Sequence, residues 1–161
     1  MRLYHGSTVL VKTPEIRMGT VYLDFGPGFY TTTSSEQAER WARIKMRREG
    51  SSHGYVAIYD FDLELASTDV VIQKFLVADM DWLQFVVRNR RGLPIETPAD
   101  MYVGPVADDN VYQSIRLFET GIFSAEETVK RLKTEVLHDQ WTFHTEKALS
   151  FCRFVGYQEV L

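Results

Sequence analysis

Three short stretches hold residue types that could build a ligand pocket. The central stretch is a glycine-rich turn over residues 24–33, in which the glycines allow the backbone to turn tightly and to approach a ligand closely. Tyr30 follows at once and offers a ring that can stack on a flat ligand. His5-Gly6-Ser7 near the start and residues 139–143 near the end add groups that form hydrogen bonds. Alone, the turn is typical of a hairpin with a core tyrosine, but the three stretches together predict a pocket.

The chain lacks the sequence patterns of several common kinds of binding or catalytic site. The segment Gly26–Thr31 has threonine where a dinucleotide-binding Gly-x-Gly-x-x-Gly needs its last glycine, and it does not open a helix directly. The chain has neither a phosphate-binding Gly-Lys-Ser/Thr sequence nor a nucleophile elbow. The four histidines are scattered without metal-ligand spacing, so we expect no metal site. The lone Cys152 lies between Phe151 and Phe154, and we do not expect it to act as a nucleophile.

The composition is that of an ordinary globular domain. The chain has 161 residues, 45% hydrophobic and 25% charged, which predicts a single domain over residues 1–161. A formal charge of −4 gives no general attraction to nucleic acid or to anionic membranes. A single cysteine excludes an internal disulfide and suits a reducing compartment. The absence of a signal peptide or a long apolar run predicts a cytoplasmic protein without membrane contacts.

Periodicity and capping residues predict the elements that must position these stretches. Ser34 should cap a helix that ends near Glu49, since Gln37 could complete a capping box and Gly50 follows. Its apolar stripe includes Trp41, while its arginines should face solvent. Further helices are expected over 79–91, with Asp79 as its cap, and over 124–133, with a capping box between Ser124 and Glu127. Helices are also expected over 109–120 and 146–149. Strands are expected over 2–4, 55–61, 70–76, 100–108, 140–144 and 157–160, with a short one at Tyr30 and a loop through 18–20.

Two of these strands are predicted to differ in their surroundings. Tyr55–Phe61 is nearly continuous in strand-forming residues, which is typical of a central strand covered on both faces. Asp100–Asp108 contains Gly-Pro, so we expect it either at a sheet edge or ending early. Because strands and helices do not alternate regularly, the pattern favours an α+β fold.

In order and spacing, His5-Gly6-Ser7, the turn Gly26–Thr32 with its following helix, and the late strand at Gln140 resemble the motifs of the ADP-ribosyltransferase superfamily. The similarity is closest to the branch of diphtheria toxin and the poly(ADP-ribose) polymerases. The segment Asp24–Thr32 and a later Gly-Pro-Val-Ala also resemble a family of short, uncharacterised bacterial proteins. The resemblance implies split mixed and antiparallel sheets with flanking helices.

The same resemblance assigns roles to residues. It implies that His5 hydrogen-bonds a ribose hydroxyl of NAD, the co-substrate. It implies that the Gly6 main chain holds the nicotinamide amide and that Tyr30 stacks on the nicotinamide ring. Ser7 and Gly28 would line the same pocket.

The third motif departs from the polymerases, which have glutamate where this chain has Gln140. Glutamine can bond a ribose hydroxyl but cannot supply a negative charge or remove a proton. This difference favours transfer of a single ADP-ribose unit over polymer elongation. A base, where one is needed, would be Asp139, Glu146, Asp108 or the acceptor itself.

The resemblance therefore predicts a mono-ADP-ribosyltransferase that modifies a protein or nucleic-acid acceptor. A compact chain without a targeting segment would suit a bacterial intracellular toxin or regulator, with a neutralising antitoxin protein as its partner. The missing glutamate leaves a non-catalytic NAD- or ADP-ribose-binding module as the alternative. An RNA 2'-phosphotransferase is less favoured, because the first strand lacks the arginines expected of that group.

Overall fold

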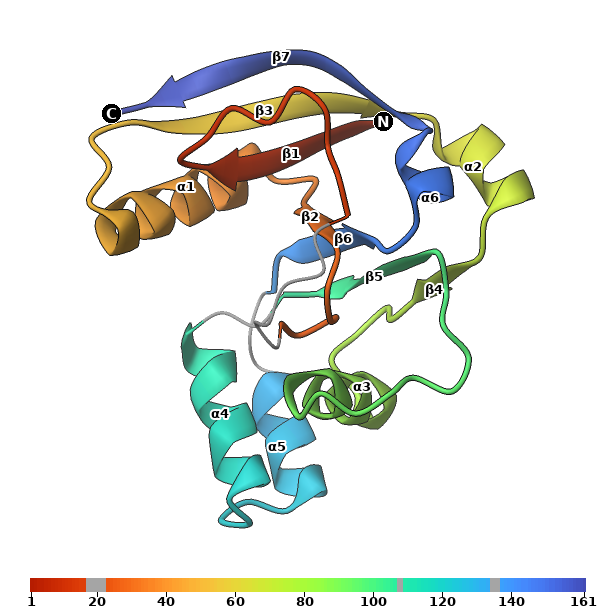
Figure 1. Cartoon of the computed structure of the whole chain (residues 1–161). Helices are drawn as coiled ribbons and strands as arrows, with labels where there is room; N and C mark the ends of the chain where they lie inside the picture. The colour runs from red at the N-terminus through yellow and green to blue at the C-terminus, as the bar shows by residue number, and fades with distance from the viewer. Residues whose placement is uncertain (17–22, 107–108, 134–136) are drawn as a thin grey trace.

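Two separate sheets organise the chain in the computed structural model, which describes residues 1–16, 23–106, 109–133 and 137–161 (Figure 1). The first sheet is antiparallel with the strand order β1-β3-β7. The second is mixed, with the order β2-β6-β5-β4, and β4 runs parallel to β5. Six helices accompany these sheets in the described part of the chain, which confirms the α+β class.

The strands are β1 (Arg2–Ser7), β2 (Phe29–Thr31), β3 (Gly54–Phe61), β4 (Ile72–Lys74), β5 (Met101–Pro105), β6 (Asp139–Phe143) and β7 (Cys152–Val160). The helices are α1 (Ser35–Glu49), α2 (Leu63–Asp69), α3 (Met80–Arg90), α4 (Asp109–Glu119), α5 (Ala125–Leu132) and α6 (Glu146–Leu149).

Helix α1 lies against the first sheet (Figure 1). Ser34 caps it by accepting a hydrogen bond from the Gln37 N–H at 3.1 Å, and Gly50 ends it with φ 66°. The predicted reciprocal bond from the Gln37 side chain does not occur among the described residues, and Gln37 is buried instead. Ala38 and Ala42 pack on Val56 of β3. Because these alanine side chains are small, the helix can approach the strand closely.

The space between the two sheets forms one apolar core. Leu3 and Tyr59 from the first sheet contact the cluster that includes Phe29 and Phe143 from the second. β3 is the central strand of its sheet, as predicted. It is buried on both faces, with Val56 against α1 and Tyr59 in the core between the sheets. A second core forms where α3 packs near β5, and it includes Trp82 and Tyr102.

The sheets are joined at the start of the chain. The N–H of Tyr4 donates to the Thr32 carbonyl at 2.8 Å, and the N–H of Thr32 donates to the Tyr4 carbonyl at 3.0 Å. This bridge brings the end of β2 beside β1. It is the reason that the glycine-rich turn and the first strand lie together.

Several elements differ from the sequence predictions. α2 was not predicted, and β7 begins at Cys152 rather than at Tyr157. β5 lies inside its sheet, between β6 and β4, so its expected place at an edge is wrong. The alternative expectation is confirmed, because the strand ends early, at Pro105. The loop predicted through residues 18–20 lies outside the described residues.

No helix in the described part of the chain combines the length and the apolar character needed to cross a membrane.

Candidate functional site

The six residues singled out in the sequence line a single cavity of about 610 Å³. They come from β1, the glycine-rich turn, β2 and β6, which are distant along the chain. A volume of this size is ordinary for a small-molecule site. The six residues are His5, Gly6, Ser7, Gly28, Tyr30 and Gln140.

The glycine-rich turn is fixed by the hydroxyl of Tyr30. This hydroxyl donates to the Gly26 carbonyl at 2.6 Å and accepts from the Phe25 N–H at 3.1 Å. Burial, and to a smaller extent the nearby Asp24 carboxylate, raises the pKa of Tyr30 well above its ordinary range, so the hydroxyl stays neutral. The ring thus lines the cavity while its polar end is held by the backbone.

Two glycines of the site are required by close packing. A Cβ atom on Gly28 would lie 2.6 Å from the Phe143 carbonyl oxygen, so β6 leaves no room for a side chain there. A Cβ atom on Gly6 would lie 1.8 Å from the Ala38 carbonyl oxygen, because α1 approaches β1 at this point. Both glycines therefore let other backbone segments approach the cavity wall.

The backbone of Gly6 is directed away from β3. In an antiparallel edge strand, alternate residues turn their N–H and C=O groups outward. Tyr4 bonds outward to Thr32, and Gly6 lies two residues further along β1. Its N–H and C=O therefore point to the same outer edge, where the described residues provide no hydrogen-bond partner for them.

The ring of His5 is oriented by β2. Its Nδ1 atom lies 2.6 Å from the Tyr30 carbonyl oxygen, and its centroid lies 4.6 Å from that of Phe29. Since a carbonyl only accepts hydrogen bonds, we assign the proton of the neutral ring to Nδ1. Nε2 is then an acceptor, which suits it to a donor such as a hydroxyl group.

Gln140 is 2% exposed and lies on β6 opposite Gly104. Its Nε2 atom donates to the Pro105 carbonyl oxygen at 3.3 Å. This contact orients the amide at the cavity wall. The position therefore supplies a fixed neutral hydrogen-bonding group and no charge.

Asp139 and Glu146, the two described carboxylates considered as bases, do not line the cavity. Asp139 accepts hydrogen bonds from Thr32, Thr33 and Trp141, and so it clamps β2 to β6. Glu146 accepts from the Ile16 N–H at 3.3 Å. Both side chains have structural roles, and Asp108 lies outside the described residues.

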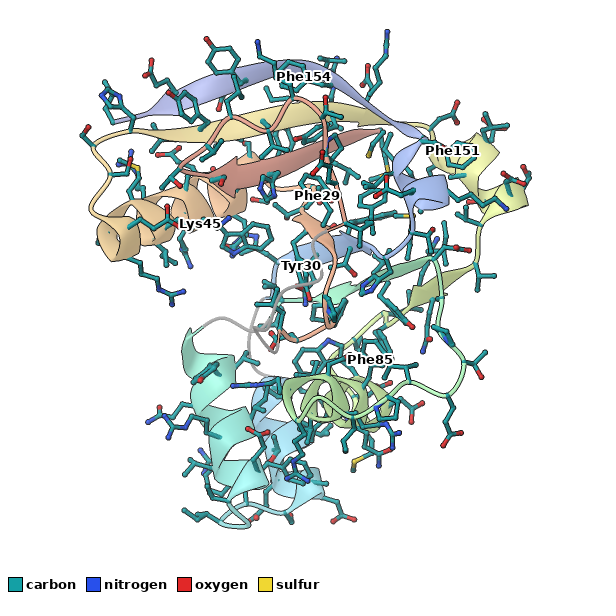
Figure 2. All side chains as sticks on the ribbon, in the orientation of Figure 1. Phe29, Tyr30, Lys45, Phe85, Phe151 and Phe154 are labelled. Carbon is teal, nitrogen blue, oxygen red and sulfur yellow. The ribbon has the colours of Figure 1, made fainter. Side chains whose placement is uncertain are left out.

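Several other residues that line the cavity were not predicted from the sequence as site residues. Trp41, Lys45 and Glu49 of α1 all line it, although Trp41 was predicted to belong to the buried stripe of the helix. Their spacing of four residues places them on one helix face, a signal that could have found them. Figure 2 shows Lys45 on α1 and Tyr30 on β2, both of which line the cavity. Asp24, Arg90 and Tyr112 also line it.

A more open depression of about 810 Å³ lies elsewhere, beside Met1, Asp60 and Arg153. It contains none of the six predicted residues. Groups of histidine, cysteine and carboxylate side chains that could hold a metal ion do not occur among the described residues.

Comparison with known proteins places the chain in one family. No curated protein and no solved structure matches it. Residues 1–154 match the model of the family described as "Protein of unknown function (DUF3990)". This match covers nearly the whole chain, which therefore belongs to the DUF3990 family.

Proposed function

We propose that the chain binds NAD in this cavity and transfers one ADP-ribose unit to a protein or nucleic-acid acceptor. The observation that carries the proposal is the meeting of His5, Gly6, Tyr30 and Gln140 around one cavity. These residues come from the three stretches that resemble the ADP-ribosyltransferase superfamily. An ADP-ribosyltransferase type of fold is part of the same proposal.

The nicotinamide end of NAD would lie between β1 and the glycine-rich turn. The outward N–H and C=O groups of Gly6 match the carbonyl and NH₂ of a carboxamide, which needs one donor and one acceptor. The Tyr30 ring, held by its hydroxyl, would stack on the pyridinium. The Nε2 atom of His5 would accept a hydrogen bond from a ribose hydroxyl.

In the proposed reaction the bond between the ribose C1 atom and the nicotinamide nitrogen breaks. Its electron pair stays on nicotinamide, which leaves as a neutral molecule. The acceptor's nucleophilic atom bonds to C1 and loses its proton to water or to a group of the acceptor. Gln140 would hold the ribose hydroxyl, but as a neutral amide it cannot stabilise an oxocarbenium-like centre by charge. Such a site suits a single transfer better than polymer elongation.

The structure also favours one alternative function. Gln140 is buried, bonded to a backbone carbonyl and uncharged, and Asp139 and Glu146 are engaged elsewhere. A cavity to which neither Asp139 nor Glu146 contributes its carboxylate fits a module that binds NAD or ADP-ribose without cleaving it.

Two measurements test these functions. Calorimetric titration with NAD and with a non-hydrolysable analogue should show binding to both, and no binding to either would exclude both functions. Nicotinamide release, followed by chromatography, then separates them, since the transferase releases nicotinamide and the binding module does not. Incubating cell material with labelled NAD and the protein, followed by mass spectrometry, would identify the acceptor.

A further inference from the structure

Arg90 has an unusual environment at the wall of the cavity. It is the last residue of α3, and its side chain is 11% exposed. Its Nε atom lies 3.9 Å from Asp24 Oδ1, and the guanidinium carbon lies 4.2 Å from the centre of the Tyr112 ring. Its Nη1 atom is buried and has no hydrogen-bond partner among the residues that the structure describes.

A buried guanidinium nitrogen without a partner is costly. An unmade hydrogen bond of a buried charged group destabilises a fold more than that of a neutral group. The Asp24 contact is long for a charge-assisted hydrogen bond, which is normally about 2.7–2.9 Å. The site thus holds a planar cation whose donors are only partly satisfied by the described residues.

The position of Arg90 relative to Tyr30 follows from the turn. A Cβ atom on Gly26 would lie 2.8 Å from Asn89 Oδ1, so the glycine-rich turn rests on the end of α3. The same Gly26 accepts the hydrogen bond from the Tyr30 hydroxyl. The turn therefore contacts both the Tyr30 hydroxyl and the end of α3 that carries Arg90, and the side chains of Tyr30 and Arg90 both line the cavity.

We propose that Arg90 is the phosphate-binding residue of the cavity and that it holds the pyrophosphate of a dinucleotide. This inference rests on the proposed function for the identity of the ligand. A guanidinium presents paired donors that match two oxygen atoms of a phosphate, which explains an arginine at this position. A ligand with a flat ring at Tyr30 and a pyrophosphate at Arg90 would span the turn.

Binding would require local rearrangement around Arg90. The anion competes with Asp24 for the guanidinium and displaces the Tyr112 ring, which is 46% exposed. Lys45 adds a second positive charge, while Glu15 and Glu49 add negative charge. Because the charges are mixed, recognition depends on the directed donors of Arg90 rather than on a general positive potential.

The test compares Arg90→Gln with Arg91→Gln, in titrations with inorganic pyrophosphate, inorganic phosphate, ADP-ribose and nicotinamide. Arg91 is the matched control, since it is adjacent, lies near Glu119 and does not line the cavity. Arg90→Gln should weaken pyrophosphate and ADP-ribose binding by about tenfold or more, as expected for a lost charge-assisted hydrogen bond. It should leave nicotinamide binding unchanged, and Arg91→Gln should behave as the wild type.

The other possible outcomes contradict either the anion site at Arg90 or the proposed function. Pyrophosphate binding that is absent from the wild type, or equal in Arg90→Gln, overturns the inference. Inorganic phosphate bound as tightly as pyrophosphate, with the same dependence on Arg90, overturns the assignment to a pyrophosphate. Pyrophosphate binding through Arg90 without NAD binding or nicotinamide release contradicts the proposed function and leaves the anion site standing. NAD cleavage that is unaffected in Arg90→Gln contradicts only the anion site.

A second measurement covers the case in which Arg90→Gln does not fold. In wild-type protein labelled with ¹⁵N-arginine, pyrophosphate should shift the Arg90 side-chain resonance, identified by its loss in Arg90→Lys. An unshifted Arg90 resonance at saturating pyrophosphate would overturn the inference.

Discussion

The hydroxyl of Tyr30 couples the glycine-rich turn to the wall of the cavity. Its two hydrogen bonds join the ring to the backbone at Phe25 and Gly26. Replacing the whole side chain would therefore change both the ligand contact and the turn. Two different substitutions are needed to separate these effects.

Tyr30→Phe should destabilise the fold by about 1–3 kcal/mol, because it leaves the Phe25 N–H and the Gly26 carbonyl without their partner. It should keep most NAD affinity, since the ring remains. Tyr30→Ala should lose stability and also reduce NAD affinity by about tenfold, because the stacking ring is gone. Urea unfolding and calorimetry measure the two quantities. Equal NAD affinities of folded Tyr30→Phe and Tyr30→Ala would exclude ring stacking.

Gln140 distinguishes the proposed enzyme from the binding module. If the amide holds a ribose hydroxyl in the transition state, Gln140→Ala should lower nicotinamide release by about a hundredfold with little change in NAD affinity. Gln140→Glu should have a raised carboxyl pKa, since the position is 2% exposed and faces the Pro105 carbonyl. Its nicotinamide release should therefore rise with pH more steeply than that of the wild type. Turnover in Gln140→Ala equal to that of the wild type would remove Gln140 from the catalytic set.

At the scale of elements, the contact between α1 and β1 fixes one wall of the cavity. Gly6 lies where the backbone of α1 approaches β1. The small side chains of Ala38 and Ala42 on the facing side of the helix permit this approach. Lys45 and Glu49 then extend from the same helix along the cavity. The position of this wall thus depends on residues that are too small to contact a ligand through side chains.

Gly6→Ala should destabilise the protein by at least about 3 kcal/mol, because its Cβ atom would lie 1.8 Å from the Ala38 carbonyl oxygen. The helix would have to move away from β1. Gly156→Ala in β7 is the matched control, since its Cβ atom would meet no atom within 4 Å. Urea unfolding of both variants tests the prediction. Equal stability of the two variants would show that α1 does not pack on β1 at this distance.

The elements with strong local signals were predictable from the sequence. The capping box of α5 forms as expected between Ser124 and Glu127, and α3 begins after its predicted cap at Asp79. The place of β5 inside its sheet was not predictable, because pairing with β4 and β6 is decided by distant residues. The residue types and their order along the chain predicted Tyr30 and Gln140 as site residues. Arg90 and Tyr112, in contrast, belong to no recognisable sequence motif. Only folding brings α3 and α4 to the cavity.

At the scale of the whole molecule, the cavity depends on the joint between the two sheets. The bridge from Tyr4 to Thr32 and the Asp139 clamp on Thr32 and Thr33 hold β1, β2 and β6 together. Loss of either contact would weaken the joint between the strands that carry His5 and Gln140. Conditions that weaken global stability should therefore also impair ligand binding.

His144 makes this global stability sensitive to acid. It follows β6, and its Nε2 atom lies 3.1 Å from the Thr142 hydroxyl oxygen while its ring packs edge-on against Tyr102. Burial lowers the pKa of His144 from 6.5 to about 4, because the charged ring would lose its hydration. Above pH 6.5 the ring is neutral in both the folded and the unfolded chain, so the full stability is present.

Between pH 6.5 and about 4, the unfolded chain binds a proton at His144 and the folded chain does not. The free energy of unfolding should therefore fall through this window, by up to about 3 kcal/mol in total, and stop falling on this account below pH 4. In His144→Gln the free energy of unfolding should depend less steeply on pH. His138→Gln, at an exposed position, should keep the pH dependence of the wild type. Urea unfolding between pH 4.5 and 7.5 measures the slopes. A slope in His144→Gln as steep as that of the wild type would mean that acid weakens the fold through other groups.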